Sequence, residues 1–219
     1  SGVYSDDMNE ATTLKTELNV FQDFRPELSP GHRKAGFVFL ANIDPDLQRN
    51  VVEQIRDPFV VALDTMNYWI ESKPASLKKT LKKVDILFIN EGEAKLLARE
   101  NNLFKAARVL LGMGPAIVVL KRAAYGALLF QKDDLFWAPA FPLQTVKDPT
   151  GAGDSFAGGF MGYISRRRSL SPGRLRKAVI YGSIMASFCV EDFSLNRTKK
   201  ITSTQIQERF QRFRDLTRF

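Results

Sequence analysis

Short runs of wholly apolar residues alternate with amphipathic segments along most of the chain, and this alternation constrains the fold more than any other feature. The apolar runs have the length of strands, as in GFVFLANI, FVVALD, VDILFIN and AIVVLK. Segments with helical apolar spacing stand between them, as in DPDLQRNVVEQI and PASLKKTLKK. Strands buried on both faces are typical of parallel sheets that helices cover. The sequence therefore predicts an α/β fold: a mostly parallel central sheet with helices on both faces, in three layers.

The segments outside this alternation predict smaller elements. The first thirty residues mix β-branched and polar residues and end in Pro26 and Pro30, which indicates one or two exposed strands and a linker. The segment YGALLFQKDDLFWAPA indicates a hairpin at the sheet edge. In the last helix, Ser203 is the expected N-cap, with Ile206, Phe210 and Phe213 on the buried stripe. The expected C-terminal helices span about residues 154–167, 172–190 and 203–216.

Composition excludes several classes of site. Apolar residues make up 44% of the chain and charged residues 26%, and no apolar run is long enough to span a bilayer, so we expect a cytoplasmic protein without membrane partners. Cys189 is the one cysteine, in an apolar stretch, and His32 the one histidine, in a polar turn. Disulfide frameworks, zinc clusters and histidine-based triads are therefore excluded. The net charge of +8 is spread along the chain, and we expect no nucleic-acid partner.

The stretch VKDPTGAGDSFAGGF, residues 146–160, carries the clearest chemistry. Gly151, Ala152 and Gly153 precede a helix, so we expect their N–H groups to be open donors at the positive end of the helix dipole. Such donors form an anion hole for a phosphoryl group in transfer. The same dipole stabilises the carboxylate of Asp154, which could accept a proton from a substrate hydroxyl. Taken alone, a GAGD segment is more simply a tight turn with an acidic residue after it.

From Asp148 to Met161 the stretch resembles the second signature of the ribokinase-like sugar and nucleoside kinases, the PfkB family. The resemblance covers nearly the whole chain from about Gly36. It implies a ribokinase-like fold, ATP and Mg²⁺ as cofactors, and Asp154 as the catalytic base beside an anion hole of the three preceding residues. Pro149 is a departure, because many members carry threonine there. Asp148 falls where some members hold a monovalent cation such as K⁺.

The segment NEGE, Asn90 to Glu93, directly follows the strand VDILFI. An amide and a carboxylate three residues apart at a helix start can hold a hydrated Mg²⁺ and phosphate oxygens. Alone, this is an N-capping pattern. It resembles the family's Asn-x-x-Glu motif, which implies that Asn90 binds the nucleotide and that Asn90 and Glu93 order the metal. A weaker resemblance, to an Asp-x-x-Asn pair near the phosphates in some members, involves Asp64 and Asn67 in LDTMN.

The segment VVLKRAAYGALLF departs from the family pattern, since many members carry Thr-Leu-Gly before a glycine that contacts the nucleotide. Lys121 and Arg122 replace the small residues, while Gly126 remains. The two cations could meet the ATP phosphates or ribose, or could cap the strand at the surface. We name Lys121 and Gly126 as nucleotide-binding residues, and the nucleotide preference stays open.

Before Gly36 the family is poorly matched. Members usually begin with a further βαβ region that carries a Gly-Gly-x-Asn motif and an acid for the sugar hydroxyls, and the sequence contains no such motif. We expect residues 1–30 to be lid-like strands and a linker, and 31–219 to be an N-terminally incomplete kinase domain. The substrate candidates are Asn42, after FVFLA, and Asn9 or Asp7 in the lid-like stretch. An exposed sheet edge favours self-association, with a homodimer through the lid as one form.

These features predict ATP-dependent phosphoryl transfer to a hydroxyl of a sugar, with a nucleoside as the alternative acceptor. Two other hypotheses stay open. One is a nucleotide-binding remnant without turnover, which the missing front and the pair Lys121 and Arg122 favour. The other is a basic nucleic-acid-binding domain, which only the net charge supports.

Overall fold

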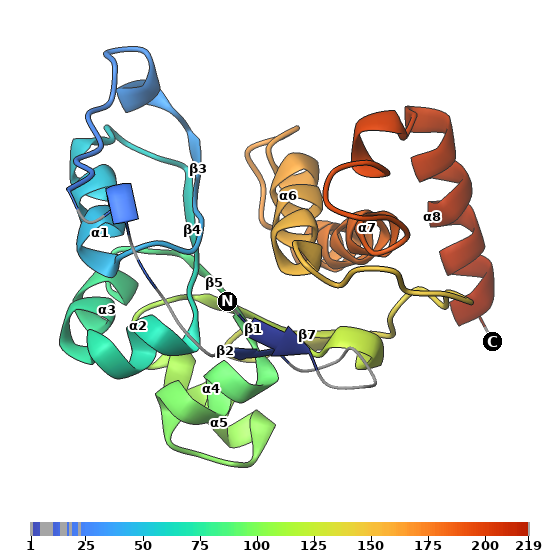
Figure 1. Cartoon of the computed structure of the whole chain (residues 1–219), viewed down its shortest axis with the longest axis horizontal. Helices are drawn as coiled ribbons and strands as arrows, with labels where there is room; N and C mark the ends of the chain where they lie inside the picture. Colours follow the sequence, from blue (N-terminus) through green and yellow to red (C-terminus); the bar gives the residue numbers. More distant parts are fainter. Residues whose placement is uncertain (1, 5–10, 14–16, 18, 22, 219) are drawn as a thin grey trace. The chain divides into compact units, whose positions relative to one another are not determined.

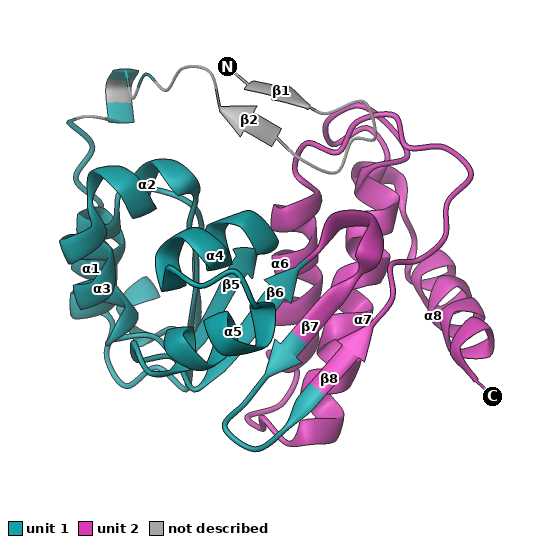
Figure 2. Cartoon of the chain, turned by 90° about the horizontal axis from the view of Figure 1, so that it is seen from below, with its two compact units in different colours: residues 1–3, 11–121, 129–135 teal, residues 4–10, 122–128, 136–219 magenta. Residues whose placement is uncertain are grey.

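The computed structural model of the chain describes residues 2–4, 11–13, 17, 19–21 and 23–218. The chain divides into two compact units, which Figure 2 colours separately. Unit 1 comprises residues 1–3, 11–121 and 129–135, and unit 2 comprises residues 4–10, 122–128 and 136–219. In the part of the chain that is described, no helix is long and apolar enough to cross a bilayer.

The predicted apolar runs form neighbouring strands of one six-stranded sheet, in the order β3-β4-β5-β6-β7-β8. The first four pair in parallel, so that Leu40 lies opposite Leu63 and Asn90 opposite Lys121. The predicted hairpin is confirmed: β8 ends the sheet, and the Gln131 N–H donates to the Asp134 carbonyl across the turn at 2.9 Å. The strands are β3 (Phe37–Leu40), β4 (Val60–Asp64), β5 (Ile86–Asn90), β6 (Ile117–Lys121), β7 (Ala127–Phe130) and β8 (Leu135–Ala138). A separate two-stranded sheet pairs β1 (Gly2–Tyr4) with β2 (Ala11–Thr13).

Helices of unit 1 connect the parallel strands. Each connection moves one strand in the same direction along the sheet, and the right-handed rule for such crossovers puts the connecting helices on one face. Figure 1 shows α1 to α5 beside β3, β4 and β5. The helices are α1 (Pro45–Gln54), α2 (Asn67–Ser72), α3 (Pro74–Leu81), α4 (Glu91–Ala98) and α5 (Leu103–Leu111). Short 3₁₀ turns lie at η1 (Asn19–Phe21), η2 (His32–Lys34), η3 (Ala123–Tyr125) and η4 (Thr198–Lys200).

Local capping explains where the helices of unit 1 begin. The Asp44 side chain accepts the Asp46 N–H at 2.9 Å before α1, and Pro45 occupies the first helical position, as the sequence predicts. The sequence did not predict α2, a single short segment that ends before Pro74. Its residues Trp69 and Ile70 are buried, but a helix of six residues is too short to display a clear apolar period.

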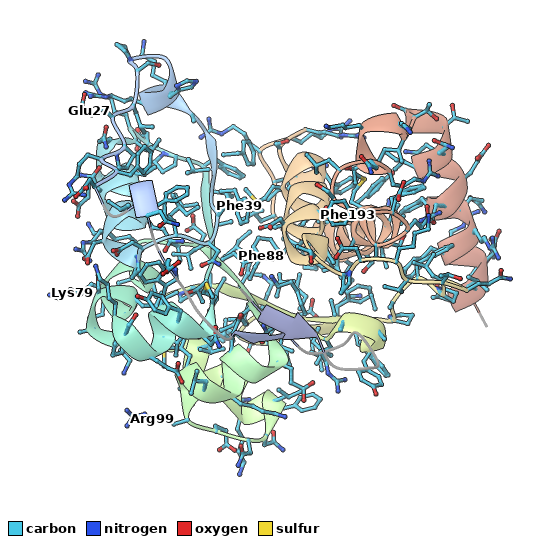
Figure 3. The ribbon with its side chains drawn as sticks, in the orientation of Figure 1. Glu27, Phe39, Lys79, Phe88, Arg99 and Phe193 are labelled. Atoms are coloured by element: carbon cyan, nitrogen blue, oxygen red, sulfur yellow. The ribbon has the colours of Figure 1, made fainter. Side chains whose placement is uncertain are left out.

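The core of unit 1 lies among the strands and their covering helices. Every residue of β4 is buried, as expected for a strand covered on both faces. Phe39 of β3 and Phe88 of β5 meet edge to face with ring centroids 5.8 Å apart, and Figure 3 labels both residues. These apolar interiors restrict the polar residues of the strands to the strand ends.

Unit 2 is built on α6 (Ala152–Ile164), α7 (Pro172–Cys189) and α8 (Ser203–Thr217). The predicted stripe of α8 is confirmed, because Phe213 is buried with Ile184 and Phe188, and Ile206 and Phe210 pack against the same cluster.

The N-cap of α8 is Thr202 instead of the predicted Ser203. Thr202 accepts the Gln205 N–H, and the Gln205 side chain accepts the Thr202 N–H in return. The amide at the third helical position thus completes a capping box one residue earlier than expected.

Helices α6 and α7 approach closely through glycine. A Cβ at Gly159 of α6 would lie 2.6 Å from the Tyr181 carbonyl oxygen of α7 and 2.7 Å from the Met185 side chain. A Cβ at the adjacent Gly158 would meet nothing within 4 Å. Gly159 is therefore required for packing, whereas Gly158 is not.

We expect Gly159→Ala to lower the free energy of unfolding by about 1–3 kcal/mol, because the new methyl group overpacks the helix contact. Gly158→Ala, the matched control one residue away, should raise it by up to about 1 kcal/mol through helix propensity. Urea denaturation of both variants measures the difference. Equal effects at the two positions would contradict the packing role of Gly159.

Candidate active site

The turn before α6 presents open backbone donors. Gly151 is the N-cap of α6 and has φ 81° and ψ 1°, a left-handed conformation that favours glycine. Among the described residues, the N–H groups of Gly151 and Gly153 have no hydrogen-bond acceptor. The Ala152 N–H instead donates to the Pro149 carbonyl at 3.2 Å. The expectation of three open donors is therefore wrong at Ala152, because the tight turn closes on Pro149.

The end of α7 supports this turn. The Lys147 N–H donates to the Val190 carbonyl at 2.8 Å, and the Cys189 thiol donates to the Thr150 carbonyl at 3.6 Å. Cys189 is buried, as expected for a cysteine in an apolar stretch. A Cβ at Gly151 would lie 3.7 Å from the Cys189 sulfur, so the thiol packs directly against the turn.

Two carboxylates flank the open donors. Asp154 is exposed and lies in the first turn of α6, where the helix dipole stabilises a negative charge. Asp148 accepts the Thr150 N–H at 2.9 Å, and hydrogen bonds from Thr150 hold the pKa of Asp148 below its usual value. Asp148 therefore favours the ionised form, as a cation ligand requires.

A second group of polar residues lies at the carboxyl ends of the strands in unit 1. Asp64, Asn90 and Lys121 are the last residues of β4, β5 and β6. The Lys121 ammonium donates to Asp64 Oδ2 at 2.6 Å, and the two side chains are only 17% and 6% exposed. Lys121 therefore forms a buried ion pair, and of the two roles that the sequence left open, capping at the surface does not describe it.

Asn90 and Glu93 form the N-terminal capping box of α4. Asn90 Oδ1 accepts the Glu93 N–H at 2.8 Å, and Glu93 Oε2 accepts the Asn90 N–H at 3.0 Å. The pKa of Glu93 is raised to about 7, chiefly because burial disfavours the charged form; the Asn90 N–H and the charge of Lys121 oppose this rise, and the charge of Asp64 adds to it. Glu93 thus shares an electrostatic environment with the buried ion pair.

Sequence reasoning missed Gln48 of α1, which is 1% exposed. Its amide nitrogen lies within hydrogen-bonding distance of the carbonyls of Leu40, Ala41 and Asp64, at 3.3, 2.9 and 2.9 Å. Gln48 therefore ties the carboxyl ends of β3 and β4 together. No sequence signal singles it out, because a glutamine in an amphipathic helix is ordinarily solvated.

The remaining predicted residues have simpler surroundings. Gly126 has φ 86°, and a Cβ there would lie 2.0 Å from the Ala138 carbonyl oxygen, so the close approach of the β7 and β8 ends requires glycine. Asn42 is exposed in the loop after β3. Asn9 and Asp7 lie outside the described residues. Among the residues that are described, no three His, Cys, Asp or Glu side chains are grouped to hold a metal ion.

Comparison with known proteins decides the family. The model of the pfkB family of carbohydrate kinases matches residues 26–201. The chain belongs to this family. The family predicted from the GAGD signature is therefore confirmed.

Curated relatives of this pfkB chain include kinases of nucleosides. A cytidine kinase from Thermococcus kodakarensis is 40% identical over 97 residues, which are 43% of this chain and 34% of the relative. A nucleoside kinase from Methanocaldococcus jannaschii is 26% identical over 166 residues, 75% of this chain and 52% of the relative. The chain thus spans about a third to a half of the length of these relatives.

Solved structures share the fold. The Methanocaldococcus jannaschii nucleoside kinase superposes with a TM-score of 0.72 at 20% identity, over 96% of this chain and 67% of that one. The fructokinase from Vibrio cholerae superposes with a TM-score of 0.70 at 16% identity, over 85% and 63%. The ribokinase-like α/β class predicted from the sequence is confirmed.

The raised pKa of Glu93 predicts a pH-dependent stability. A folded-state pKa of about 7 against 4.5 favours the neutral carboxyl in the folded protein. This contribution is complete below about pH 4.5 and is lost as the pH rises through 7, for a total of up to about 3 kcal/mol. Glu93→Gln keeps the capping acceptor but cannot ionise, so it should become more stable than wild type as the pH rises from 4.5 to 8.

Urea denaturation across this pH range measures the effect. Glu53→Gln, which removes an exposed carboxylate of α1, is the matched control. A constant difference in stability between Glu93→Gln and wild type at all pH values would show that Glu93 does not titrate in this window.

Proposed function

We propose that the protein transfers the γ-phosphoryl group of ATP to a hydroxyl of a sugar. The observation that carries this proposal is the start of α6, where the open N–H groups of Gly151 and Gly153 lie next to the carboxylate of Asp154. Phosphoryl transfer depends on positioning and on stabilising charge, and a helix N-terminus supplies the charge stabilisation from fixed backbone dipoles. Membership of the pfkB family supports the same reaction.

In this proposal the two glycine N–H groups receive the oxygens of the phosphoryl group during transfer. Ala152, predicted as the third member of the anion hole, contributes its place in the turn, since its N–H already donates to Pro149. Asp154 accepts the proton of the attacking hydroxyl, which becomes a better nucleophile as the new bond to phosphorus forms. The buried end of α7 keeps these groups in place through Cys189 and Val190.

Magnesium is the divalent cofactor that we propose. The residues present fit binding of Mg²⁺ through its water ligands instead of direct coordination. Asn90 Oδ1 and Glu93 Oε2 each accept a backbone N–H in the capping box, so Glu93 Oε1 is the oxygen left for a metal-bound water. When bound with ATP, Mg²⁺ offsets the negative charge of the phosphate oxygens. Asp148 is the proposed ligand of a K⁺ ion, because hydrogen bonds from Thr150 and Ser194 hold the pKa of its carboxyl low and so favour the ionised form.

The nucleotide would contact Lys121, Asn90 and Gly126 in this proposal. Lys121 and Asn90 end neighbouring parallel strands, where ligands bind in open α/β sheets. At Gly126 the close approach of the hairpin ends already requires a glycine. The presence of glycine there is therefore explained without a nucleotide contact.

A nucleoside is the second candidate acceptor. The names of the relatives from Thermococcus kodakarensis and Methanocaldococcus jannaschii favour it, and a nucleoside presents the same kind of ribose hydroxyl to Asp154. Asn42 and Asn9 remain the proposed acceptor contacts. We also propose a cytoplasmic location and a homodimer through the lid.

Replacement of the proposed base tests the mechanism. Asp154→Asn in the full-length protein should lower kcat by about 10²–10⁴ with little change in the affinity for ATP, because only proton transfer is lost. A coupled assay of ADP release measures kcat, and Glu208→Gln, an exposed carboxylate of α8, is the control. Wild-type turnover by Asp154→Asn would disprove the assignment of the base.

A panel of acceptors tests the substrate class. Sugars and nucleosides presented singly with ATP and Mg²⁺ should give phosphorylated product with at least one hexose, ribose or nucleoside, detected by mass spectrometry. Phosphorylation of a nucleoside but no free sugar would select the second candidate. ATP binding without any phosphorylated product would instead favour a nucleotide-binding remnant.

A further inference from the structure

The ion pair of Asp64 and Lys121 crosses the end of a strand. Asp64 ends β4 and Lys121 ends β6, and β5 lies between them in the sheet. Two strand spacings separate the backbones by roughly 9–10 Å. Asp64 lies opposite Phe88 and Lys121 opposite Asn90, so the two residues are also offset along the strand direction. The two side chains together span this separation and meet in a salt bridge of 2.6 Å. The ammonium is therefore held at one place above the carboxyl end of β5.

Asp64 is itself fixed from several directions. Its Oδ2 accepts from Lys121, and its Oδ1 accepts the Thr65 N–H at 2.9 Å. Its backbone carbonyl accepts the Gln48 amide at 2.9 Å. The side chain is 6% exposed, so solvent does not compete for the carboxylate. The Asp64 carboxylate is therefore fixed in position and can fix the position of the Lys121 ammonium.

Lys121 keeps donors for a further partner. An ammonium has three N–H donors, and among the described residues one of them is used, by Asp64. The charge of Lys121 also reaches Glu93 at the start of α4, where it opposes the effect of burial on the pKa. The carboxyl ends of parallel strands are where ligands of open α/β sheets bind, so the free donors lie at a ligand-binding edge.

We propose that Asp64 is a positioning residue that holds the Lys121 ammonium toward the β- and γ-phosphates of ATP. This inference rests on the proposed function. A free lysine would lose side-chain entropy when it binds a phosphate, and the ion pair removes that loss before the nucleotide arrives. Protein kinases solve the same physical problem with a lysine that a glutamate on another element holds against the phosphates.

Nucleotide binding to the full-length protein tests this assignment without the need for turnover. Asp64→Asn should weaken the binding of ATP about tenfold, as expected for a charged hydrogen bond that loses its geometry. It should leave the binding of AMP unchanged, because AMP lacks the β- and γ-phosphates. Isothermal titration calorimetry with ATP and AMP measures both affinities.

A double-mutant cycle separates positioning from stability. Lys121→Met leaves the buried carboxylate of Asp64 without its ion-pair partner, so the melting temperature of this variant should fall below that of wild type. The double variant Asp64→Asn/Lys121→Met should regain much of this stability and bind ATP no more weakly than Lys121→Met alone, because Asp64 acts through Lys121.

Lys73→Met is the matched control, since Lys73 forms an ion pair of the same length with Asp44, at 2.6 Å in the same unit. It should leave the ratio of ATP to AMP affinity unchanged. The assignment is overturned by wild-type ATP affinity in Asp64→Asn, by equal losses for ATP and AMP, or by additive losses in the double variant.

Failure of the proposed function would look different. A protein that binds ATP with the expected pattern but phosphorylates no acceptor contradicts the proposed reaction and leaves the role of Asp64 in nucleotide binding intact. A wild-type protein that does not bind ATP contradicts both.

Discussion

Parallel pairing of β3 to β6 determines where the polar chemistry of unit 1 can occur. The strand interiors are apolar and buried, so a polar side chain is tolerated only where a strand ends. Parallel strands bring all their carboxyl ends to one edge, and this edge therefore gathers Asp64, Asn90 and Lys121. Asp64 and Lys121 are 57 residues apart in sequence and still form a direct ion pair. The pairing of the strands, and not local sequence, creates this cluster.

The two candidate groups of residues, one in each unit, control charge in opposite ways. At the start of α6, the exposed carboxylate of Asp154 lies in the first helical turn, and hydrogen bonds hold the pKa of nearby Asp148 low. At the strand ends, burial raises the pKa of Glu93 to about 7 although a lysine lies near it. Carboxylates of similar intrinsic acidity are thus separated by their surroundings. One environment maintains a charge, and the other suppresses it.

Much of this architecture follows from the sequence, and the exceptions have physical causes. The strands, the hairpin and most helices are predictable because apolar period and capping residues are local signals. Helix α2 is too short to show a period, and the Thr202 cap depends on a competition between neighbouring residues. Ala152 was wrongly expected to be an open donor because the turn geometry before α6 could not be read from GAGD.

The candidate site is less predictable than the fold. The partner of Lys121 depends on strand order and register, and the role of Gln48 depends on three carbonyls at the ends of two strands, β3 and β4. Neither is visible in a linear pattern. The motif residues Asp154, Gly151 and Gly153 were identifiable only because their signature is specific to a family. Their roles, the contacts of Asn9 and the domain boundary near residue 30 stay predictions.

The packing of Cys189 against Gly151 and Thr150 has a practical consequence. Within these 219 residues Cys189 is the one thiol, so a thiol-directed label attaches at a single position. Because the sulfur is buried against the backbone of the turn, the label can enter only when the turn and the end of α7 separate. The rate of labelling therefore reports how often that turn opens, and it can be recorded without a substrate or a mutation.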